Sequence, residues 1–484
     1  MSHRSVFAEA KQGGGAGWRQ ICIKLRKRVL LTAVFMLILS AGTACALELS
    51  AGAVVPFGQN TVLVRSDSAG SLTLLPSLPD YDLMPVVTDQ AIEAGETSIP
   101  WDGLSWYGEP LPPGMLTLNA RLQDASGTVS EASVQIRISS PLCAAVSCLP
   151  DADVFCPKDG ALRVECGLSR KGAVRVEIAS AKEPDKVLRT LEGKAKDTVP
   201  VTLKWDGKNR KRKTLPDGDY ILTAYSTDLP DRRVSASVTL TSSPVPVPAV
   251  SETGSIIPPD PENDEEVWAA LTAPAVVGAG TEGQGLYLMK KKKYSPGGSI
   301  SARTAAVRVM EVDGGWCRVA AWRQAVGEYM EGWVQTEKLT VIAPRLHYGA
   351  LINKKDQTMT VYEDGRRIGR IRVSTGLLSN ANPLAATPPG VYLIGSRMKD
   401  FQMDGYHYDY PIRLHGDYLL HTVGYRVRDS VRYYTKELEV LGGAASHGCV
   451  RMDIRATEES GGLNAWWVWT HLGRDTRVIV TEGE

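Results

Sequence analysis

An internal duplication constrains the fold more than any other feature of the sequence. The tripeptide WDG at residues 101–103 recurs 104 residues later, and so does the LP-x-G tetrapeptide at 111–114. The register continues without a gap through the ASV at 132–134. Self-similarity at a fixed period indicates that each copy is one structural unit. Apolar residues alternate with charged ones in the second copy, as at Val174 and Val176, which predicts strands that turn one apolar side to a core.

The two copies, residues 49–141 and 150–242, resemble the Ig-like repeats of the flagellar hook-capping (FlgD-like) type, which carry the same two motifs. The resemblance implies two β-sandwiches and is silent on function, because one fold serves many functions. We expect Trp101 and Trp205 to form a turn and the edge of a core rather than a ligand site.

Composition narrows the class of protein. The 484 residues include 55 Lys and Arg against 54 Asp and Glu, so the basic excess of a nucleic-acid binder is absent. Gly (46) and Pro (28) are frequent and Phe (5) is rare, which favours short strands and turns over an all-helical chain. The length predicts roughly three or four domains in a mainly β protein.

The first 46 residues predict export. Basic residues at 24–28 precede a charge-free run, residues 29–47, and ACA at 44–46 has the small-x-small pattern of a cleavage site. Residues 1–46 are therefore interpreted as a signal peptide or, if left uncleaved, as a signal anchor that holds the protein to the inner membrane through residues 29–47. In both cases the bulk of the chain is placed in the periplasm or elsewhere in the cell envelope.

Export permits disulfides. Four cysteines within 24 residues are predicted to form two disulfides, with three connectivities open; they are Cys143, Cys148, Cys156 and Cys166. A zinc site is disfavoured because the cluster has neither a C-x-x-C pair nor a nearby histidine.

Two further segments precede the C-terminal region. Residues 243–275 are rich in Pro and acidic residues and predict an extended linker. Residues 276–343 contain short strand patterns and two Gly-Trp pairs, which predict a small five-stranded barrel that resembles bacterial SH3-like domains. Trp316 and Trp333 are expected to pack in its core, and an aromatic groove for cell-wall peptides is the alternative.

The segment SHGCVR at 446–451 carries the chemistry. A thiolate is the nucleophilic form of cysteine, and a nearby imidazole can take the thiol proton. Cys449 is therefore the candidate nucleophile. Gly448 has no side chain, so backbone N–H groups could approach an oxyanion there. His447 is a further catalytic candidate, but it lies two residues before Cys449, and side chains two apart on an extended segment point the same way yet seldom reach each other directly.

A second histidine is needed as the general base. His421 ends an apolar, strand-like run and is the candidate, with the carbonyl or hydroxyl of Thr422 as the group that orients its ring. His415 is the rival base. Arg451 could receive a carboxylate bidentately.

Residues 346–484 resemble the YkuD-type L,D-transpeptidase domain, whose motif is a His followed later by Ser/Thr-His-Gly-Cys, an aliphatic residue and Arg or Asn. Supporting matches run through the segment, among them VSTG at 373–376, TPPG at 387–390 and NAWW at 464–467. The spacing departs from the family, because 24 residues separate His421 from Ser446. We interpret them as an insertion, of which residues 425–440 form a lid.

The resemblance implies a β-sandwich catalytic domain with a few short helices and a cysteine acyltransferase that needs no metal or cofactor. Its donor would be a peptidoglycan stem tetrapeptide, and its acceptor a second stem peptide, a lipoprotein lysine or water. Ser446, Tyr406 and Tyr408 are placed in substrate binding, with core packing as the alternative for the tyrosines. No nucleic-acid partner is expected, and a membrane is involved only through the N-terminal anchor.

Three other functions compete with a transpeptidase. A metal hydrolase is disfavoured because its candidate ligands lack a His-x-x-x-His spacing and interleaved carboxylates; those ligands are His407, His415, His421, His447 and Cys449. A non-catalytic envelope scaffold is disfavoured because the nucleophile and base are both present. A thiol hydrolase, an L,D-carboxypeptidase or amidase, would use the same site.

Overall fold

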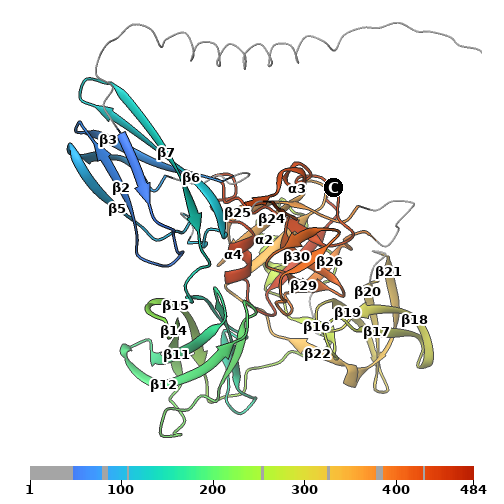
Figure 1. The fold of residues 1–484 in the computed structure, drawn as a ribbon. Helices are drawn as coiled ribbons and strands as arrows, with labels where there is room; N and C mark the ends of the chain where they lie inside the picture. The colour runs from blue at the N-terminus through green and yellow to red at the C-terminus, as the bar shows by residue number, and fades with distance from the viewer. Residues whose placement is uncertain are drawn as a thin grey trace, which may run out of the picture. The chain divides into compact units, whose positions relative to one another are not determined.

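The computed structural model describes seven stretches of the chain, separated by short gaps. These are residues 47–78, 85–105, 108–251, 255–323, 328–377, 385–428 and 431–483. The predicted signal segment at 1–46 lies outside them, and within them no helix is long and apolar enough to cross a membrane. Strands dominate, which confirms the mainly β prediction (Figure 1).

Repeat 1 is a pair of antiparallel sheets whose inner faces form one core. One sheet has the order β1-β2-β5: β1 (Leu47–Ala51), β2 (Asn60–Ser66) and β5 (Gly95–Trp101). The other has the order β4-β3-β6-β7: β3 (Gly70–Ser77), β4 (Val87–Ile92), β6 (Gly114–Asp124) and β7 (Val129–Ile138). Alternate residues of β2 and β6 are buried, because a strand turns successive side chains to opposite faces.

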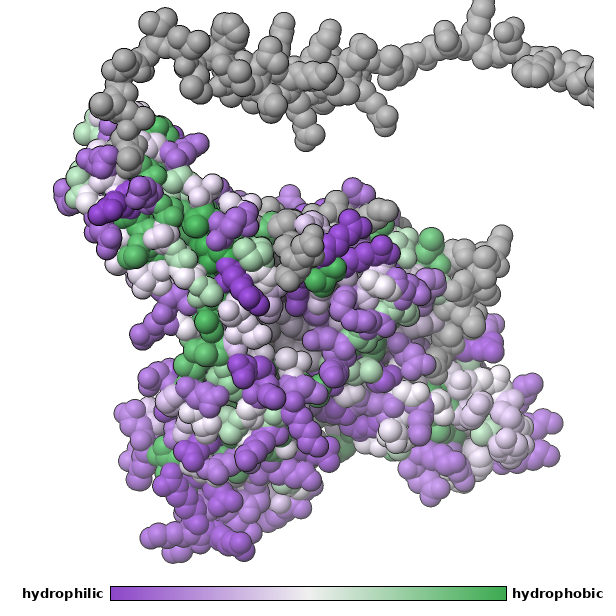
Figure 2. Space-filling view, viewed as in Figure 1, coloured by the Kyte–Doolittle hydropathy of each residue, from purple (hydrophilic) through white to green (hydrophobic). Residues whose placement is uncertain are grey.

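Repeat 2 has the same two-sheet plan. The smaller sheet is β13-β10-β8: β8 (Ala145–Pro150), β10 (Leu162–Leu168) and β13 (Val201–Trp205). The larger is β12-β11-β14-β15-β9: β9 (Val154–Phe155), β11 (Gly172–Ser180), β12 (Glu183–Ala195), β14 (Gly218–Ser226) and β15 (Leu229–Leu240). Hydrophilic side chains cover most of the face of repeat 2 that Figure 2 shows.

The WDG motif forms the same turn in both repeats. The carboxylates of Asp102 and Asp206 each accept the backbone N–H two residues later, at 3.1 and 3.2 Å. The following glycines have φ of 69° and 71°, a conformation that glycine adopts without strain. Trp101 and Trp205 are buried. As expected, the motif sets a turn at the edge of a core.

The four clustered cysteines are free thiols in the structure, so the two predicted disulfides are absent. Cys148 and Cys166 lie opposite each other on β8 and β10 and their side chains interact, and the thiol of Cys148 also contacts the carbonyl of Leu222. Cys143 instead contacts the carbonyl of Arg170. The four therefore act as small buried residues of the repeat 2 core, in which free cysteine is common.

The predicted linker is partly folded, which corrects the expectation for residues 243–275. Helix α2 (Asp264–Leu271) begins at Asn263, whose side chain accepts the N–H of Glu266. Val267 and Leu271 are fully buried against the C-terminal domain. Val267 and Leu271 lie one helical turn apart, and together with the partly buried Trp268 they dock a segment that is otherwise polar.

The predicted barrel contains seven strands in one sheet rather than five, in the order β18-β17-β21-β20-β19-β16-β22. They are β16 (Ala275–Gly278), β17 (Gly285–Lys291), β18 (Lys293–Ser301), β19 (Ala306–Asp313), β20 (Trp316–Trp322), β21 (Tyr329–Gln335) and β22 (Leu339–Ile342), with a 3-10 turn η1 (Thr336–Lys338) before the last. Trp316 and Trp333 are only half-buried, and the neighbouring Cys317 and Val334 fill the core instead. The expectation that both tryptophans are core residues is therefore wrong, because the alternation along β20 and β21 turns them to the opposite face.

The C-terminal domain is built on an eight-stranded sheet, β26-β34-β23-β24-β25-β33-β30-β29. Its strands are β23 (Tyr348–Asn353), β24 (Thr358–Glu363), β25 (Arg366–Ser374), β26 (Gly390–Leu393), β29 (Ile412–His415), β30 (Tyr418–Thr422), β33 (Val450–Met452) and β34 (Arg477–Thr481). Two hairpins, β27 (Phe401–Met403) with β28 (Tyr406–Tyr408) and β31 (Arg426–Arg428) with β32 (Val431–Tyr433), and two helices, α3 (Thr435–Glu439) and α4 (Ala465–His471), complete it.

Candidate active site

Two parallel strands bring the predicted nucleophile and base to one face of the sheet. Strand β30 pairs with β33 so that His421 lies opposite Arg451. Cys449 immediately precedes β33, and Leu419 donates its N–H to the Cys449 sulfur at 3.4 Å. Because side chains two apart on a strand share a face, His421 and Cys449 lie on the same side of the sheet.

The motif loop is fixed by the end of strand β25. Ser446 accepts and donates backbone hydrogen bonds there: its N–H donates to the carbonyl of Thr375 at 3.0 Å, and its carbonyl accepts the N–H of Leu377 at 2.9 Å. Its hydroxyl accepts the N–H of Gly448 at 3.1 Å and donates to the carbonyl of Cys449. Ser446 is 3% exposed, so the structure assigns it to the loop scaffold rather than to substrate contact.

Two residues that sequence reasoning missed complete this scaffold. Thr387 donates its hydroxyl to the carbonyl of Gly448 at 2.9 Å and accepts the N–H of Gly376 at 2.8 Å. Gln357 bonds both the N–H and the hydroxyl of Thr375, each at 2.8 Å. Thr387 lies in the TPPG turn that matched the family pattern, which was the available signal for it.

Gly448 is a position that only glycine fits. Its φ is 112°, a conformation that residues with a Cβ rarely adopt. A Cβ there would lie 2.3 Å from the Tyr418 ring. The missing side chain lets the tyrosine pack directly against the backbone beside the nucleophile.

The base is held in one tautomer. Nδ1 of His421 lies 2.7 Å from the Thr422 carbonyl, which can only accept, so Nδ1 carries the proton and Nε2 is the basic nitrogen. Burial lowers the pKa of His421 to about 4, against the partial opposition of the hydrogen bond to Thr422. The imidazole is therefore neutral at physiological pH and able to accept a proton.

Thr422 orients His421 through its carbonyl, because its hydroxyl is used elsewhere. That hydroxyl accepts the N–H of Asp409 at 3.0 Å, and the Thr422 N–H donates to the Asp409 carbonyl at 3.0 Å. The Asp409 carboxylate in turn accepts from Tyr425 at 3.0 Å and pairs with Arg432. No local sequence pattern indicated this support, in which Asp409 lies between β28 and β29 while Tyr425 and Arg432 belong to the inserted segment.

Aromatic side chains enclose the base. Tyr408 and Phe401 meet the His421 ring edge-on, at centroid distances of 4.9 and 5.5 Å. Tyr408 is 3% exposed, which agrees with core packing rather than a groove. Tyr406 is half-buried and lies under the guanidinium of Arg426.

The surroundings of Cys449, the candidate nucleophile, favour the thiol over the thiolate. Burial raises the pKa of Cys449, and the Leu419 N–H and the Arg451 cation oppose that rise. The pKa of His421 is lowered as well, so both shifts favour the neutral thiol and imidazole over a thiolate and an imidazolium. Proton transfer must then accompany attack on a carbonyl.

Arg451 is already paired within the chain. Its Nη1 lies 2.6 Å from Oε2 of Glu437 on α3, and their side chains are 12% and 16% exposed. A carboxylate of the protein thus holds the guanidinium that we expected to receive a substrate carboxylate.

The remaining histidines are dispersed. His447 is exposed, and His407 stacks on Tyr425. His415 is fully buried against Tyr392, and burial lowers its pKa to about 3, which does not suit it to the role of a base. Among the residues that the structure describes, no three His, Cys, Asp or Glu side chains are gathered as metal ligands would be.

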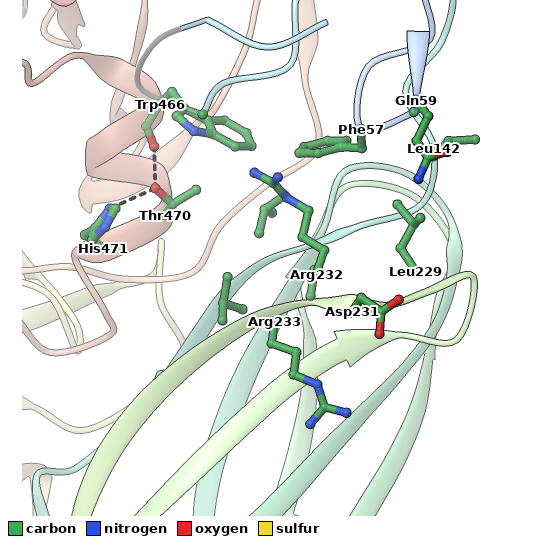
Figure 3. Close-up of a pocket in the computed structure, with 15 residues that line it drawn as sticks. Phe57, Gln59, Leu142, Leu229, Asp231, Arg232, Arg233, Trp466, Thr470 and His471 are labelled. Carbon is green, nitrogen blue, oxygen red and sulfur yellow. Dashed lines mark hydrogen bonds between the residues drawn. The ribbon is translucent and has the colours of Figure 1, made fainter. Parts of the chain in front are cut away.

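A large cavity lies away from these residues. Both repeats and helix α4 line a cavity of about 1010 Å³, in which the Arg232 guanidinium covers the Phe57 ring at 4.4 Å and faces Trp466 (Figure 3). None of the catalytic candidates lines it. It marks where the repeats meet the catalytic domain.

Comparison with known proteins assigns the C-terminal domain. Residues 347–480 match the model of the YkuD family, the L,D-transpeptidase catalytic domain. A Bacillus subtilis (strain 168) protein named as an L,D-transpeptidase, YciB, is 29% identical over 135 residues, which are 27% of this chain and 63% of that protein. The chain thus spans less than two thirds of the length of this relative.

Solved structures of L,D-transpeptidases also align. The one from Mycobacterium tuberculosis H37Rv shares 18% identity over 48% of this chain and 89% of its own, with a TM-score of 0.23. The one from Mycobacterium smegmatis shares 13% over 49% and 100%, with a TM-score of 0.22. These scores are too low to establish a common fold over the aligned length. The family match and the curated relative together identify residues 347–480 as an L,D-transpeptidase catalytic domain of the YkuD family.

Proposed function

We propose that the protein is an exported peptidoglycan L,D-transpeptidase that uses Cys449 as nucleophile and His421 as base. The observation that carries the proposal is their common face on the paired strands β30 and β33, with the basic nitrogen of His421 left free by the bond from Nδ1 to Thr422. The substrate class and the transfer reaction come from the family to which the domain belongs.

The first half of the reaction forms a thioester. The Cys449 sulfur attacks the carbonyl that precedes the terminal D-alanine of a stem tetrapeptide, while Nε2 of His421 accepts the thiol proton. Collapse of the tetrahedral intermediate breaks the C–N bond, and the imidazolium returns the proton to the leaving amine of D-alanine. A pKa of about 4 makes His421 a weak base but a strong acid for that second transfer.

The second half transfers the acyl group. An acceptor amine attacks the thioester, the C–S bond breaks, and the sulfur regains its proton through His421. A stem-peptide amine gives a crosslink, and a lipoprotein lysine gives an attached protein. Water gives a shortened stem, the outcome of a thiol hydrolase.

Charge on the tetrahedral oxygen needs a donor beside the nucleophile. Gly448 does not supply one, because its N–H donates to Ser446 and its carbonyl accepts from Thr387. The N–H of Cys449 itself is adjacent to the reacting sulfur and is the donor that we propose. Gly448 contributes by keeping this peptide unit in a fixed orientation.

The test is turnover of defined muropeptides. The chain from Leu47 and its Cys449→Ala variant are incubated separately with disaccharide tetrapeptides, and the masses of the products are measured by mass spectrometry. A dimer with loss of D-alanine, absent with the variant, supports transpeptidation. A tripeptide monomer indicates hydrolysis, and no product from a folded, alkylatable protein contradicts the proposed donor.

A further inference from the structure

The inserted segment between His421 and Ser446 is a packed element with a small core of its own. Tyr425, Tyr434 and Leu441 are buried together against Ile454 of the catalytic domain, and Leu438 of helix α3 packs on them. Hydrophobic contacts therefore fix the position of α3 relative to strand β33. The side chain of the residue before Leu438 on α3 is thereby held at a defined place.

That side chain is Glu437. It accepts a hydrogen bond from Arg451 at 2.6 Å in a pair that is largely withdrawn from water. Removing two charges from water is costly, so such a pair persists only where the geometry holds it firmly. The bond is also short and charge-assisted, the strong kind of hydrogen bond.

The position of Arg451 allows its charge to act on both Cys449 and His421. It lies two residues after Cys449 on the same face and opposite His421 in the strand register. A fixed cation there stabilises a thiolate and disfavours an imidazolium. It acts in these directions on the pKa of both groups, lowering that of Cys449 and that of His421.

We infer that Glu437 is a positioning residue, whose carboxylate holds the Arg451 guanidinium beside the Cys449 sulfur. The inserted helix thereby sets the charge around the nucleophile, in addition to any covering of the cleft. The inference rests on the proposed function only in taking Cys449 as the nucleophile.

The measurement is the rate at which iodoacetamide alkylates Cys449, followed from pH 6 to 10 on the intact chain from Leu47. Peptide mass mapping reports the adduct at this cysteine separately from the five buried ones. The charged and titratable groups around this thiol lie on three elements and the turn before β30: Asp417, Tyr418, His421, Arg451 and Glu437. All but the last two are unchanged in the variants below.

Glu437→Ala releases Arg451, so the apparent pKa of Cys449 should rise. Alkylation at pH 7 should then slow by about three- to tenfold, which is part of the effect that a nearby opposite charge has on a pKa. Glu437→Gln, which keeps the shape, should give a smaller change in the same direction. Glu439→Ala is the matched control, because it removes an exposed carboxylate from the same helix, and it should leave the profile unchanged.

Arg451→Gln tests the route. It should slow alkylation as Glu437→Ala does, and adding Glu437→Ala to it should slow alkylation no further. Faster alkylation in Glu437→Ala would show that the carboxylate acts by its own charge and would overturn the inference, as would an unchanged profile in a protein with wild-type circular dichroism. Because alkylation needs no peptide, the result stands apart from whether muropeptides are turned over.

Discussion

Replacing Gly448 by alanine should disable the site while leaving the rest of the chain folded. The new methyl carbon would lie 2.3, 2.6 and 2.7 Å from three atoms of the Tyr418 ring, where contacts shorter than 3.0 Å do not persist. To reach an ordinary contact of about 3.4 Å, the ring or the peptide must move by about 1 Å. A misplacement of that size costs on the order of 100-fold in rate.

Backbone strain adds to the steric clash. At a φ of 112°, an alanine costs about 1–3 kcal/mol relative to glycine. The loop cannot relax freely, because Thr387 and Ser446 hold both peptide groups of residue 448. We therefore expect a lower melting temperature together with the loss of activity.

Three assays separate these effects: release of D-alanine from tetrapeptide, alkylation of Cys449 and thermal unfolding. Gly443→Ala is the matched control, since Gly443 is exposed, its φ is not in the left-handed range and a Cβ would meet its neighbour at 3.5 Å. Gly448→Ala combined with Tyr418→Ala should remove the clash but keep the strain, and so recover part of the stability. If Gly448→Ala kept more than about a third of the wild-type rate, the argument from the close approach would be wrong.

Three further results are expected. The rate of acylation at limiting substrate should fall below about pH 4, where His421 takes up a proton. His421→Gln should abolish this acidic limb of the pH–rate profile and lower the rate at higher pH. An acidic limb near pH 6.5 would instead mean that the ring is hydrated. Burial raises the pKa of Glu109 to about 7 from 4.5, so the folded chain binds this proton more tightly than the unfolded chain does. The resulting contribution to stability is present at pH 4.5 and is lost as the pH rises through 7. The melting temperature of Glu109→Gln relative to wild type should therefore increase between about pH 5 and 7.5, and a constant difference would count against this argument. Glu165→Gln should lower the free energy of unfolding by about 3 kcal/mol, because it leaves the buried Arg397 guanidinium without its carboxylate partner. The measurement is the melting temperature, and a fall no larger than that of an exposed Glu→Gln change would refute the prediction.

The sequence predicted the chemistry better than its support. Cys449 and His421 could be chosen because the motif and the apolar run are local patterns, and the structure places both on one face. Glu437 and Asp409 could not, because their contacts depend on how the inserted segment folds back over strands distant in sequence. Thr387 lay in a matched turn, yet nothing local indicates that its hydroxyl would reach the Gly448 carbonyl.

Errors in the fold predictions have similar causes. The count of prolines and charges over 243–275 did not indicate helix α2, because a few apolar residues decide whether a short helix docks and an average composition does not show them. Gly-Trp pairs located strands β20 and β21 but not which face of each strand the tryptophans occupy. Cysteine spacing predicted proximity, which holds for Cys148 and Cys166, whose side chains interact across strands β8 and β10. Spacing alone does not determine whether neighbouring thiols are bridged, and all four are free in the structure.

Charged side chains from three parts of the chain meet beside the end of helix α4. Glu165 of repeat 2 contacts Arg397 at 3.1 Å and Arg474 at 3.9 Å, and Arg474 also pairs with Glu282 of the barrel. Arg397 is fully buried and donates further to the carbonyls at the end of helix α4. A guanidinium that is this deeply buried is tolerable only while its carboxylate partner is present. Loss of Glu165 from repeat 2 is therefore expected to leave a buried, unpaired guanidinium inside the C-terminal domain, so a change in the repeat should weaken that domain as well.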